Sequence, residues 1–131
     1  MSEPIFFVSH FRIKEGRLDA LRRMSGDSTE RLRAEKPRTV LFLSYIDEDQ
    51  GVVSFLHAFE DADAMDLHFE GADERSRTAY ELIDPIGWEF YGRPSPSALE
   101  TMRQAAASTG ATLSVQPEYL AGFLRLAPDP A

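Results

Sequence analysis

The histidines are the first side chains to consider, because histidine is the side chain whose ordinary pKa lies closest to neutral pH. His68 belongs to the stripe Met65, His68, Phe69 and Ala72, which has the i, i+3, i+4, i+7 spacing of one helix face. This spacing predicts a helix with His68 on its buried side. Such a histidine is either a catalytic base or a core residue that is hydrogen-bonded to backbone or to a neighbour. As a base it would deprotonate an acidic phenol or enol, the step that makes such a compound reactive towards O2.

His10 and His57 lie in runs that are typical of strands, each beside large apolar residues. We take His10 as a second candidate for catalysis and His57 as a residue that lines a ligand pocket. For each of them, a hydrogen-bonded core histidine is the alternative. The chain has no cysteine and no HxH or HxxxH spacing, so we expect neither thiolate chemistry nor a metal site.

Aromatic residues on the predicted strands suit a flat aromatic ligand, which would stack on them with a few polar anchors. Packing in the core or in a dimer interface is the alternative for each. Glu89, between Trp88 and Phe90, is either an inward carboxylate with a raised pKa or, as we expect, an outward one. No phosphate-binding glycine loop or dinucleotide fingerprint is present, so we expect no cofactor. The expected ligand-binding residues are Tyr45, His57, Trp88, Tyr91, Phe42 and Phe55.

The elements that must position these residues follow the order β-α-β-β-α-β. This order predicts the α+β class, with a ferredoxin-like βαββαβ antiparallel sheet. The expected elements are a strand at 5–13, a helix at 17–36, a hairpin at 38–60, a helix from Asp61, a further helical segment at 74–83, a break at Asp84-Pro85 and a strand at 86–92.

The chain continues beyond this core. Residues 93–131 predict a C-terminal extension with a helix that Ser97 and Glu100 cap, followed by a short strand at 112–116. We treat residues 1–131 as a single domain in which 5–92 form the ferredoxin-like core.

The hairpin carries apolar side chains on both faces. Val40, Phe42 and Ile46 point one way, while Leu41, Leu43 and Tyr45 point the other. Helices in a ferredoxin-like fold cover only one face of the sheet. A large exposed apolar patch marks an interface, so we expect a homodimer with sheet facing sheet, which could enclose a ligand cavity.

Bulk composition excludes several classes of partner. The net charge is −8, with +3 in residues 1–38 (nine Lys/Arg, six Asp/Glu) and −11 in residues 39–131 (five and sixteen). A negative protein is a poor partner for nucleic acid, so none is expected. Apolar runs are far shorter than the roughly 20 residues of a membrane-spanning helix, and residues 1–4 lack the basic region of a secretory signal. We therefore expect a cytoplasmic protein without a membrane partner.

Three segments carry a family resemblance: FRIKEGRLDAL at 11–21, FLHAFEDADAMDLHFEG at 55–71 and WEFYG at 88–92. With them, the chain resembles the antibiotic biosynthesis monooxygenase-like group of dimeric α/β barrels over residues 5–92. The histidine one to two turns into the second helix is the most specific match. The resemblance implies a homodimer with a pocket in each subunit, which binds a small aromatic ligand.

Similar proteins include cofactor-free oxygenases of aromatic polyketides and haem-degrading enzymes. Catalytic members commonly use an asparagine, and this chain has none. A tryptophan often precedes the second helix, where this chain has Phe59-Glu60; its tryptophan is Trp88. The first hypothesis is a cofactor-independent monooxygenase acting on a small aromatic or polyketide-like compound. The alternatives are a non-catalytic ligand-binding or interaction domain and, third, haem binding or degradation.

Overall fold

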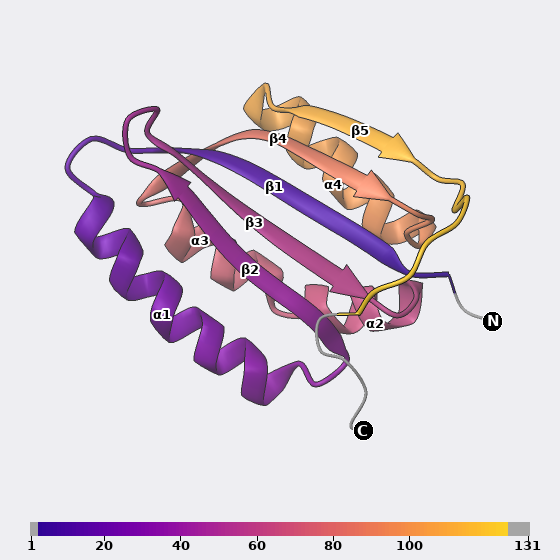
Figure 1. The fold of residues 1–131 in the computed structure, drawn as a ribbon. Helices are drawn as coiled ribbons and strands as arrows, with labels where there is room; N and C mark the ends of the chain where they lie inside the picture. Colours follow the sequence, from indigo (N-terminus) through magenta and orange to yellow (C-terminus); the bar gives the residue numbers. More distant parts are fainter. Residues whose placement is uncertain (1–2, 126–131) are drawn as a thin grey trace.

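The computed structural model describes residues 3–125 as one sheet with helices on one side of it (Figure 1). The strands stand in the order β2-β3-β1-β4-β5, with antiparallel pairing except between β4 and β5, which are parallel. The predicted α+β class and the βαββαβ core are confirmed. The strands are β1 (Ile5–Ile13), β2 (Thr39–Asp47), β3 (Val52–Phe59), β4 (Ile83–Tyr91) and β5 (Thr112–Gln116); the helices are α1 (Leu18–Glu35), α2 (Ala62–Phe69), α3 (Ala72–Ala79) and α4 (Pro96–Thr109).

Local sequence explains where the hairpin and the second helix begin. In the turn between β2 and β3, Asp47 accepts a hydrogen bond from the Gln50 amide at 3.1 Å, and Gly51 has φ 67°. Glycine takes this left-handed conformation without strain. Asp61 caps α2, because its side chain accepts from the Ala64 amide at 2.9 Å. The polar turn and the cap therefore explain where the chain reverses between β2 and β3 and where α2 begins.

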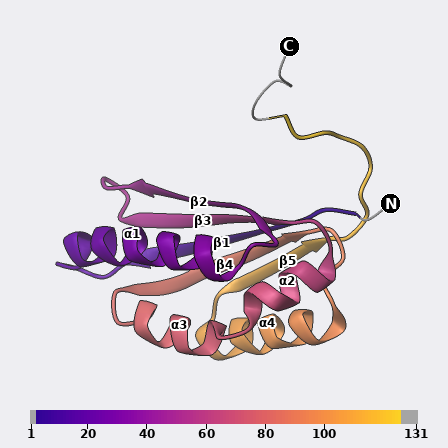
Figure 2. The same ribbon diagram turned by 90° about the horizontal axis from the view of Figure 1, so that it is seen from below.

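The core lies between the sheet and the helices, as the view along the layers shows (Figure 2). Alternate residues of the central strand β1 point into it, and β3 and β4 add their own inward side chains. Phe7 stacks on Phe90 with ring centroids 4.7 Å apart. The least exposed large side chains are Phe59, Phe90, Ile5, Leu21, Met65, Ile83 and Val53.

Strand β4 begins earlier than the sequence predicts. The expected break at Asp84-Pro85 is wrong, since β4 starts at Ile83 and the helical segment before it ends at Ala79. A bulge explains the difference: Pro85 pairs with Phe11 and Gly87 with His10, so that Ile86 is the extra residue. A proline is tolerated at a bulge, where the ladder is already interrupted.

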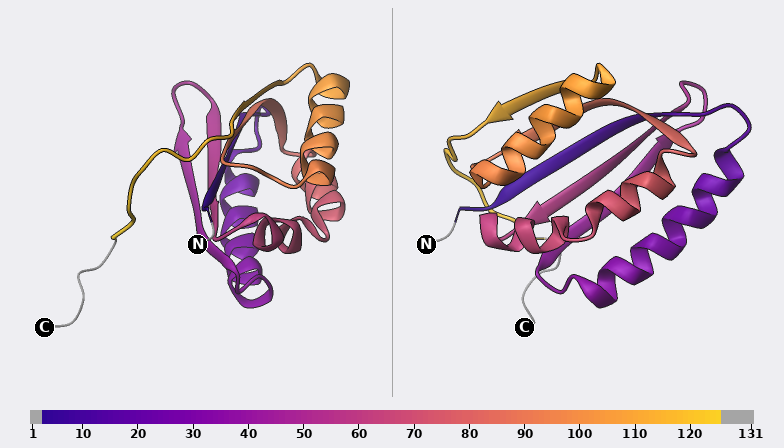
Figure 3. Two further views of the ribbon diagram at one scale, coloured as in Figure 1. Left: turned by 90° about the vertical axis from the view of Figure 1, so that its right-hand side faces the viewer. Right: turned by 180° about the vertical axis from the view of Figure 1, so that it is seen from behind.

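The C-terminal extension joins the helix layer and the sheet edge. Ala98 and Met102 of α4 are buried in the core, and β5 pairs with β4. The cap of α4 is Ser95 rather than Ser97, because the Ala98 amide donates to Ser95 Oγ at 3.2 Å. Pro96 then occupies the first turn, where its missing N–H costs nothing. Neither α4 nor β5 covers the other side of the sheet (Figure 3).

Close packing at Gly87 provides a test of how β5 joins the sheet. A Cβ at position 87 would collide with Thr112 Oγ1 of β5. We expect Gly87→Ala to lower the free energy of unfolding by about 1–3 kcal/mol, as overpacking does. Urea denaturation measures this loss.

Thr112→Ala in the same background removes the colliding atom and should restore much of the lost stability. Equal stability of Gly87→Ala and the unmodified chain would contradict this packing of β5 against β4.

Candidate functional site

The side of the sheet opposite the helices, here called the open face, combines apolar and polar side chains. Strand register defines it: on β1, Phe7 points into the core while Phe6, Val8 and His10 point outward. The open face is formed by Phe6, Val8 and His10 of β1, Leu41, Leu43 and Tyr45 of β2, Ser54 and Leu56 of β3, and Glu89 and Tyr91 of β4.

Four side chains of the open face form a continuous hydrogen-bonded network. His10 Nδ1 lies 2.7 Å from Ser54 Oγ, and His10 Nε2 lies 2.5 Å from Glu89 Oε1. The Tyr91 hydroxyl donates to the second oxygen, Glu89 Oε2, at 2.6 Å. The side chains of His10 and Glu89 are 37% and 34% exposed, so the network is accessible from solution. We call these four residues the open-face network.

The charge state of Glu89 sets the direction of these hydrogen bonds. The bond from Tyr91 and the bond from His10 lower the pKa of Glu89, so it is a carboxylate at neutral pH. The same contact with Glu89 raises the pKa of Tyr91, which keeps its proton and donates. His10 Nε2–H then donates to Glu89, and Nδ1 is left to accept from the Ser54 hydroxyl. The alternative of an inward Glu89 with a raised pKa is wrong.

Three of the network residues were outside the catalytic set expected from sequence. His10 was expected there, whereas Ser54 and Glu89 were not, and Tyr91 was expected only as a ligand-binding residue. Ser54 stands directly opposite His10 in the ladder between β1 and β3. Glu89 and Tyr91 share a face because they are two residues apart on one strand. Correct register from sequence, including the bulge in β4, would have found the network.

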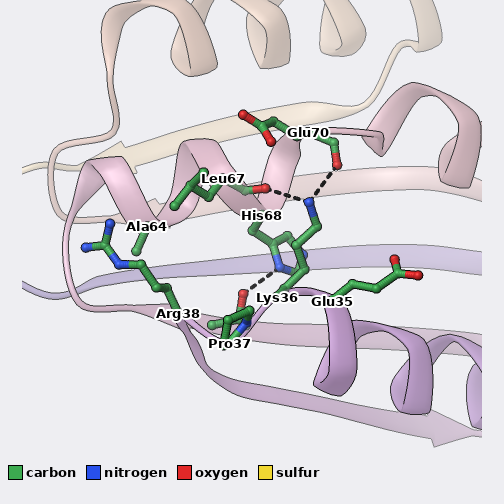
Figure 4. Close-up of a pocket in the computed structure, with 9 residues that line it drawn as sticks. Glu35, Lys36, Pro37, Arg38, Ala64, Leu67, His68 and Glu70 are labelled. Atoms are coloured by element: carbon green, nitrogen blue, oxygen red, sulfur yellow. Dashed lines mark hydrogen bonds between the residues drawn. The ribbon is translucent and has the colours of Figure 1, made fainter.

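A second candidate site is a cavity of about 280 Å³ beside His68 on the helix side (Figure 4). Lys36 and Arg38 enclose it between α1 and α2. Lys36 Nζ donates to the carbonyls of Leu67 and Glu70 at the end of α2, at 2.7 and 3.1 Å. Arg38 donates to Asp61 at the start of α2. A cation at the C-terminal carbonyls and a carboxylate at the N-terminus both stabilise the helix dipole, so these contacts hold α2 against the segment between α1 and β2.

His68 and His57 form a buried pair behind this cavity. Their ring centroids are 5.0 Å apart, and His68 is 4% exposed, as its helical stripe predicted. His68 Nδ1 lies 2.7 Å from Thr39 Oγ1, and His57 Nδ1 donates to the Phe7 carbonyl at 3.2 Å.

Burial makes both histidines neutral. Burial lowers the pKa of His57 to about 4. Burial, with the neighbouring His57, Arg75 and Lys36, lowers the pKa of His68 to about 3. A neutral imidazole with so low a pKa is a weak base. The predicted catalytic role of His68 stays a prediction.

The residues expected from sequence to form one site lie on two sides of the sheet. The open face brings together His10, Tyr45 and Tyr91. The helix side holds His68, His57, Trp88, Phe42 and Phe55. Phe42 stacks on Phe55, and the buried Trp88 contacts Phe11 edge to face. A single ligand cannot contact both groups, since the sheet separates them.

Known proteins with the same fold share little sequence with this chain. MupZ from Pseudomonas fluorescens has a TM-score of 0.69 at 16% identity, over 93% of this chain and 91% of that one. A conserved protein from Methanosarcina mazei Go1 has a TM-score of 0.59 at 15% identity, over 70% of this chain and 93% of that one. A third protein, from Bacteroides thetaiotaomicron, is named as a candidate antibiotic biosynthesis monooxygenase. Its TM-score is 0.54 at 13% identity, over 62% of this chain and 80% of that one. The chain shares its ferredoxin-like α+β fold with these proteins.

The likeness to MupZ extends over the C-terminal extension as well as the core, because it covers nearly the whole chain. At these identities the likeness establishes the fold alone. No protein-family model and no curated protein matches the sequence.

The described residues also bear on metal binding and on membrane-spanning helices. Within residues 3–125, no three His, Asp or Glu side chains gather in a way that could hold a metal ion. In the same range, no helix has the length and apolar character needed to cross a membrane.

The buried histidine pair predicts a dependence of stability on pH. Both pKa values are lower in the folded chain than the ordinary 6.5, so the unfolded chain binds more protons between about pH 4 and 6.5. Stability is therefore complete above pH 6.5 and falls as the pH falls through this window. Each histidine should cost about 2 kcal/mol at pH 5. Urea denaturation at pH 7 and pH 5 measures the loss.

His68→Gln should reduce the loss of stability between pH 7 and pH 5 by about half. Thr39→Val removes the hydroxyl that contacts His68 but no titrating group, so this variant should show the full loss of stability between pH 7 and pH 5. Equal losses in His68→Gln and the unmodified chain would show that His68 does not titrate as its burial requires.

Proposed function

We propose that the chain is a cofactor-independent monooxygenase that binds a small aromatic or polyketide-like compound on the open face. The observation that carries this proposal is the open-face network, which holds an imidazole between a hydroxyl and a carboxylate among apolar side chains. An apolar surface with a few fixed polar groups suits a flat, weakly acidic compound. The fold of the candidate monooxygenase from Bacteroides thetaiotaomicron agrees with this class of reaction.

Each residue of the network has a role in removing a proton. The substrate phenol or enol gives its proton to Ser54 Oγ as the Ser54 hydroxyl proton moves to His10 Nδ1, 2.7 Å away. Glu89 stabilises the imidazolium that forms, because its carboxylate accepts from Nε2. Tyr91 holds Glu89 in place through its second oxygen. The network thus makes a base of His10 without burying a charge.

Molecular oxygen is the oxidant in the following step. The enolate carbon attacks O2, and one oxygen atom forms a C–O bond. The O–O bond then breaks as water leaves, so that a CH2 group becomes a carbonyl. Substrate plus O2 gives oxidised product plus water, and the electrons come from the substrate itself.

A homodimer is part of the same proposal. The open face exposes Leu43, Tyr45 and Tyr91. A second copy facing the first would exclude water from the apolar part of the face and enclose the ligand.

Non-catalytic binding of a small ligand on the same scaffold is the second candidate. The complete absence of asparagine favours it, because catalytic proteins that the chain resembles commonly use one. It requires the open face to bind ligand without turnover.

Oxygen uptake with a panel of hydroxyanthrones tests the proposal. His10→Gln should lower the rate by about 10²–10⁴-fold, the usual contribution of a positioned base. Glu89→Gln should lower it at least about tenfold, since an amide cannot stabilise the imidazolium. Glu100→Gln, an exposed glutamate on α4, is the matched control and should keep the rate.

Two results would overturn the proposal. A rate that falls in His68→Gln but not in His10→Gln would move the base to the helix side of the sheet. If the unmodified chain and all variants are inert but bind the hydroxyanthrones, the function is ligand binding.

A further inference from the structure

Ser54 lies at one end of the open-face network, and its hydroxyl contacts a base. Ser54 Oγ is 2.7 Å from His10 Nδ1, and His10 Nε2 is 2.5 Å from Glu89 Oε1. A hydroxyl within hydrogen-bond reach of an imidazole, which a carboxylate orients from the other side, is the arrangement of an activated serine nucleophile. The network therefore contains the groups for a second kind of chemistry, in which Ser54 attacks a substrate instead of relaying its proton.

The charges within the network agree with this role. Tyr91 and His10 both donate to Glu89, and these hydrogen bonds lower the pKa of Glu89, so the carboxylate is ionised at neutral pH. An ionised Glu89 stabilises the imidazolium that forms when His10 takes the serine proton. Compared with serine proteases the two ring nitrogens exchange places, because there Nε2 faces the serine. Either nitrogen of a neutral imidazole can accept a proton, so the roles of the three groups are kept.

Strand register places an apolar surface beside the serine. The row of open-face side chains on one side of Ser54 is apolar and consists of Val8, Leu56 and Leu43. The row on its other side is charged at both ends, with Arg12 and Asp47. An ester whose apolar part lies on the apolar row would bring its carbonyl carbon to Ser54 Oγ.

Tyr45 stands on the opposite side of Ser54 from His10. Ser54 pairs with His10 in the ladder with β1 and with Tyr45 in the ladder with β2, so the three side chains leave the same face in one row. Tyr45 is 60% exposed, and its hydroxyl is accessible from solution. A tyrosine hydroxyl is one of the donors that stabilise the oxyanion of a tetrahedral intermediate. Tyr45 is thus placed to supply the donor that acyl transfer requires.

We propose that Ser54, His10 and Glu89 form a nucleophilic triad that hydrolyses esters of small aromatic alcohols. Tyr45 donates to the oxyanion of the intermediate. This activity goes beyond the proposed function and does not depend on it, because it needs neither O2 nor an acidic substrate. It rests on the contacts of Ser54 with its neighbours and on the register of the open face.

The reaction has two steps. In the first, Ser54 Oγ forms a bond to the ester carbonyl carbon as its proton moves to His10 Nδ1. The bond from this carbon to the phenol oxygen then breaks, and the phenol leaves with the proton from His10. In the second step water attacks the acyl carbon and gives a proton to His10, and the bond to Ser54 Oγ breaks as the serine takes this proton back. Ester plus water gives acid plus phenol, and nothing is oxidised or reduced.

A fluorophosphonate tests the nucleophile directly, because it forms a stable phosphorus–oxygen bond with an activated serine. We expect one adduct per chain, on the peptide that contains Ser54, as measured by mass spectrometry. Ser54→Ala and His10→Gln should each lower the rate of labelling at least about a hundredfold. Ser114 is exposed on β5 opposite Glu89, so Ser114→Ala is the matched control and should keep the rate. An unmodified chain that is not labelled at Ser54 would overturn the proposal.

A cysteine at position 54 provides a test that needs no turnover. The chain has no cysteine, so Ser54→Cys contains a single thiol. A thiol beside an imidazole ionises at lower pH than a free one. At pH 6, Ser54→Cys should therefore react with iodoacetamide at least about tenfold faster than Ser114→Cys. Adding His10→Gln should remove this difference, whereas equal rates of the two single variants would contradict activation by His10.

Hydrolysis of p-nitrophenyl acetate, followed by the release of p-nitrophenol, measures the complete reaction. Ser54→Ala should lower the rate at least about a hundredfold and Tyr45→Phe at least about tenfold, while Ser114→Ala keeps it. If Ser54 is labelled and the ester is hydrolysed but hydroxyanthrones are not oxidised, the triad stands and the proposed function fails. Oxidation of hydroxyanthrones without labelling of Ser54 would overturn the triad and leave the proposed function in place.

Discussion

Burial of two apolar faces of one sheet is the constraint on which the rest of the structure depends. The helix layer meets it on one side, where Phe7, Phe59 and Phe90 lie in the core. On the other side the described chain supplies no layer, because α4 and β5 of the C-terminal extension occupy the helix side and the sheet edge. The open face is therefore the surface that the proposed second copy would cover, and it also carries the open-face network.

The two groups of histidines differ because burial acts on them differently. His57 and His68 are enclosed behind the sheet, where desolvation favours the neutral ring and lowers each pKa far below 6.5. Their hydrogen bonds to backbone and to Thr39 are those of packed core residues. On the open face, by contrast, Glu89 remains ionised beside His10 and can stabilise an imidazolium. The proposed function therefore uses the open-face network and not the buried histidine pair.

Much of the fold could be predicted from periodicity and turn chemistry, and the site only in part. Alternation in β1 and the stripe through His68 indicate buried faces because one face of each element is packed. The bulge at Ile86 was not predictable, since it depends on the pairing of β4 with β1, and it decides that Glu89 faces His10 rather than the core. Tyr91 joins the network through the same register, whereas Ser54 joins it through the pairing of β3 with β1. Alternation along a strand separates Phe42 from Tyr45, but it does not show which of the two faces the helices cover.

The most direct test of this account is the mass of the chain in solution. Sedimentation equilibrium at micromolar concentration should give twice the mass of one chain, 14.7 kDa, because the proposed homodimer covers the open face of each copy. Substitution of Leu43 and Tyr45 by serine should shift the equilibrium towards the single chain. A monomeric mass for the unmodified protein under these conditions would contradict the account, since the open face would then be stable in water without a partner.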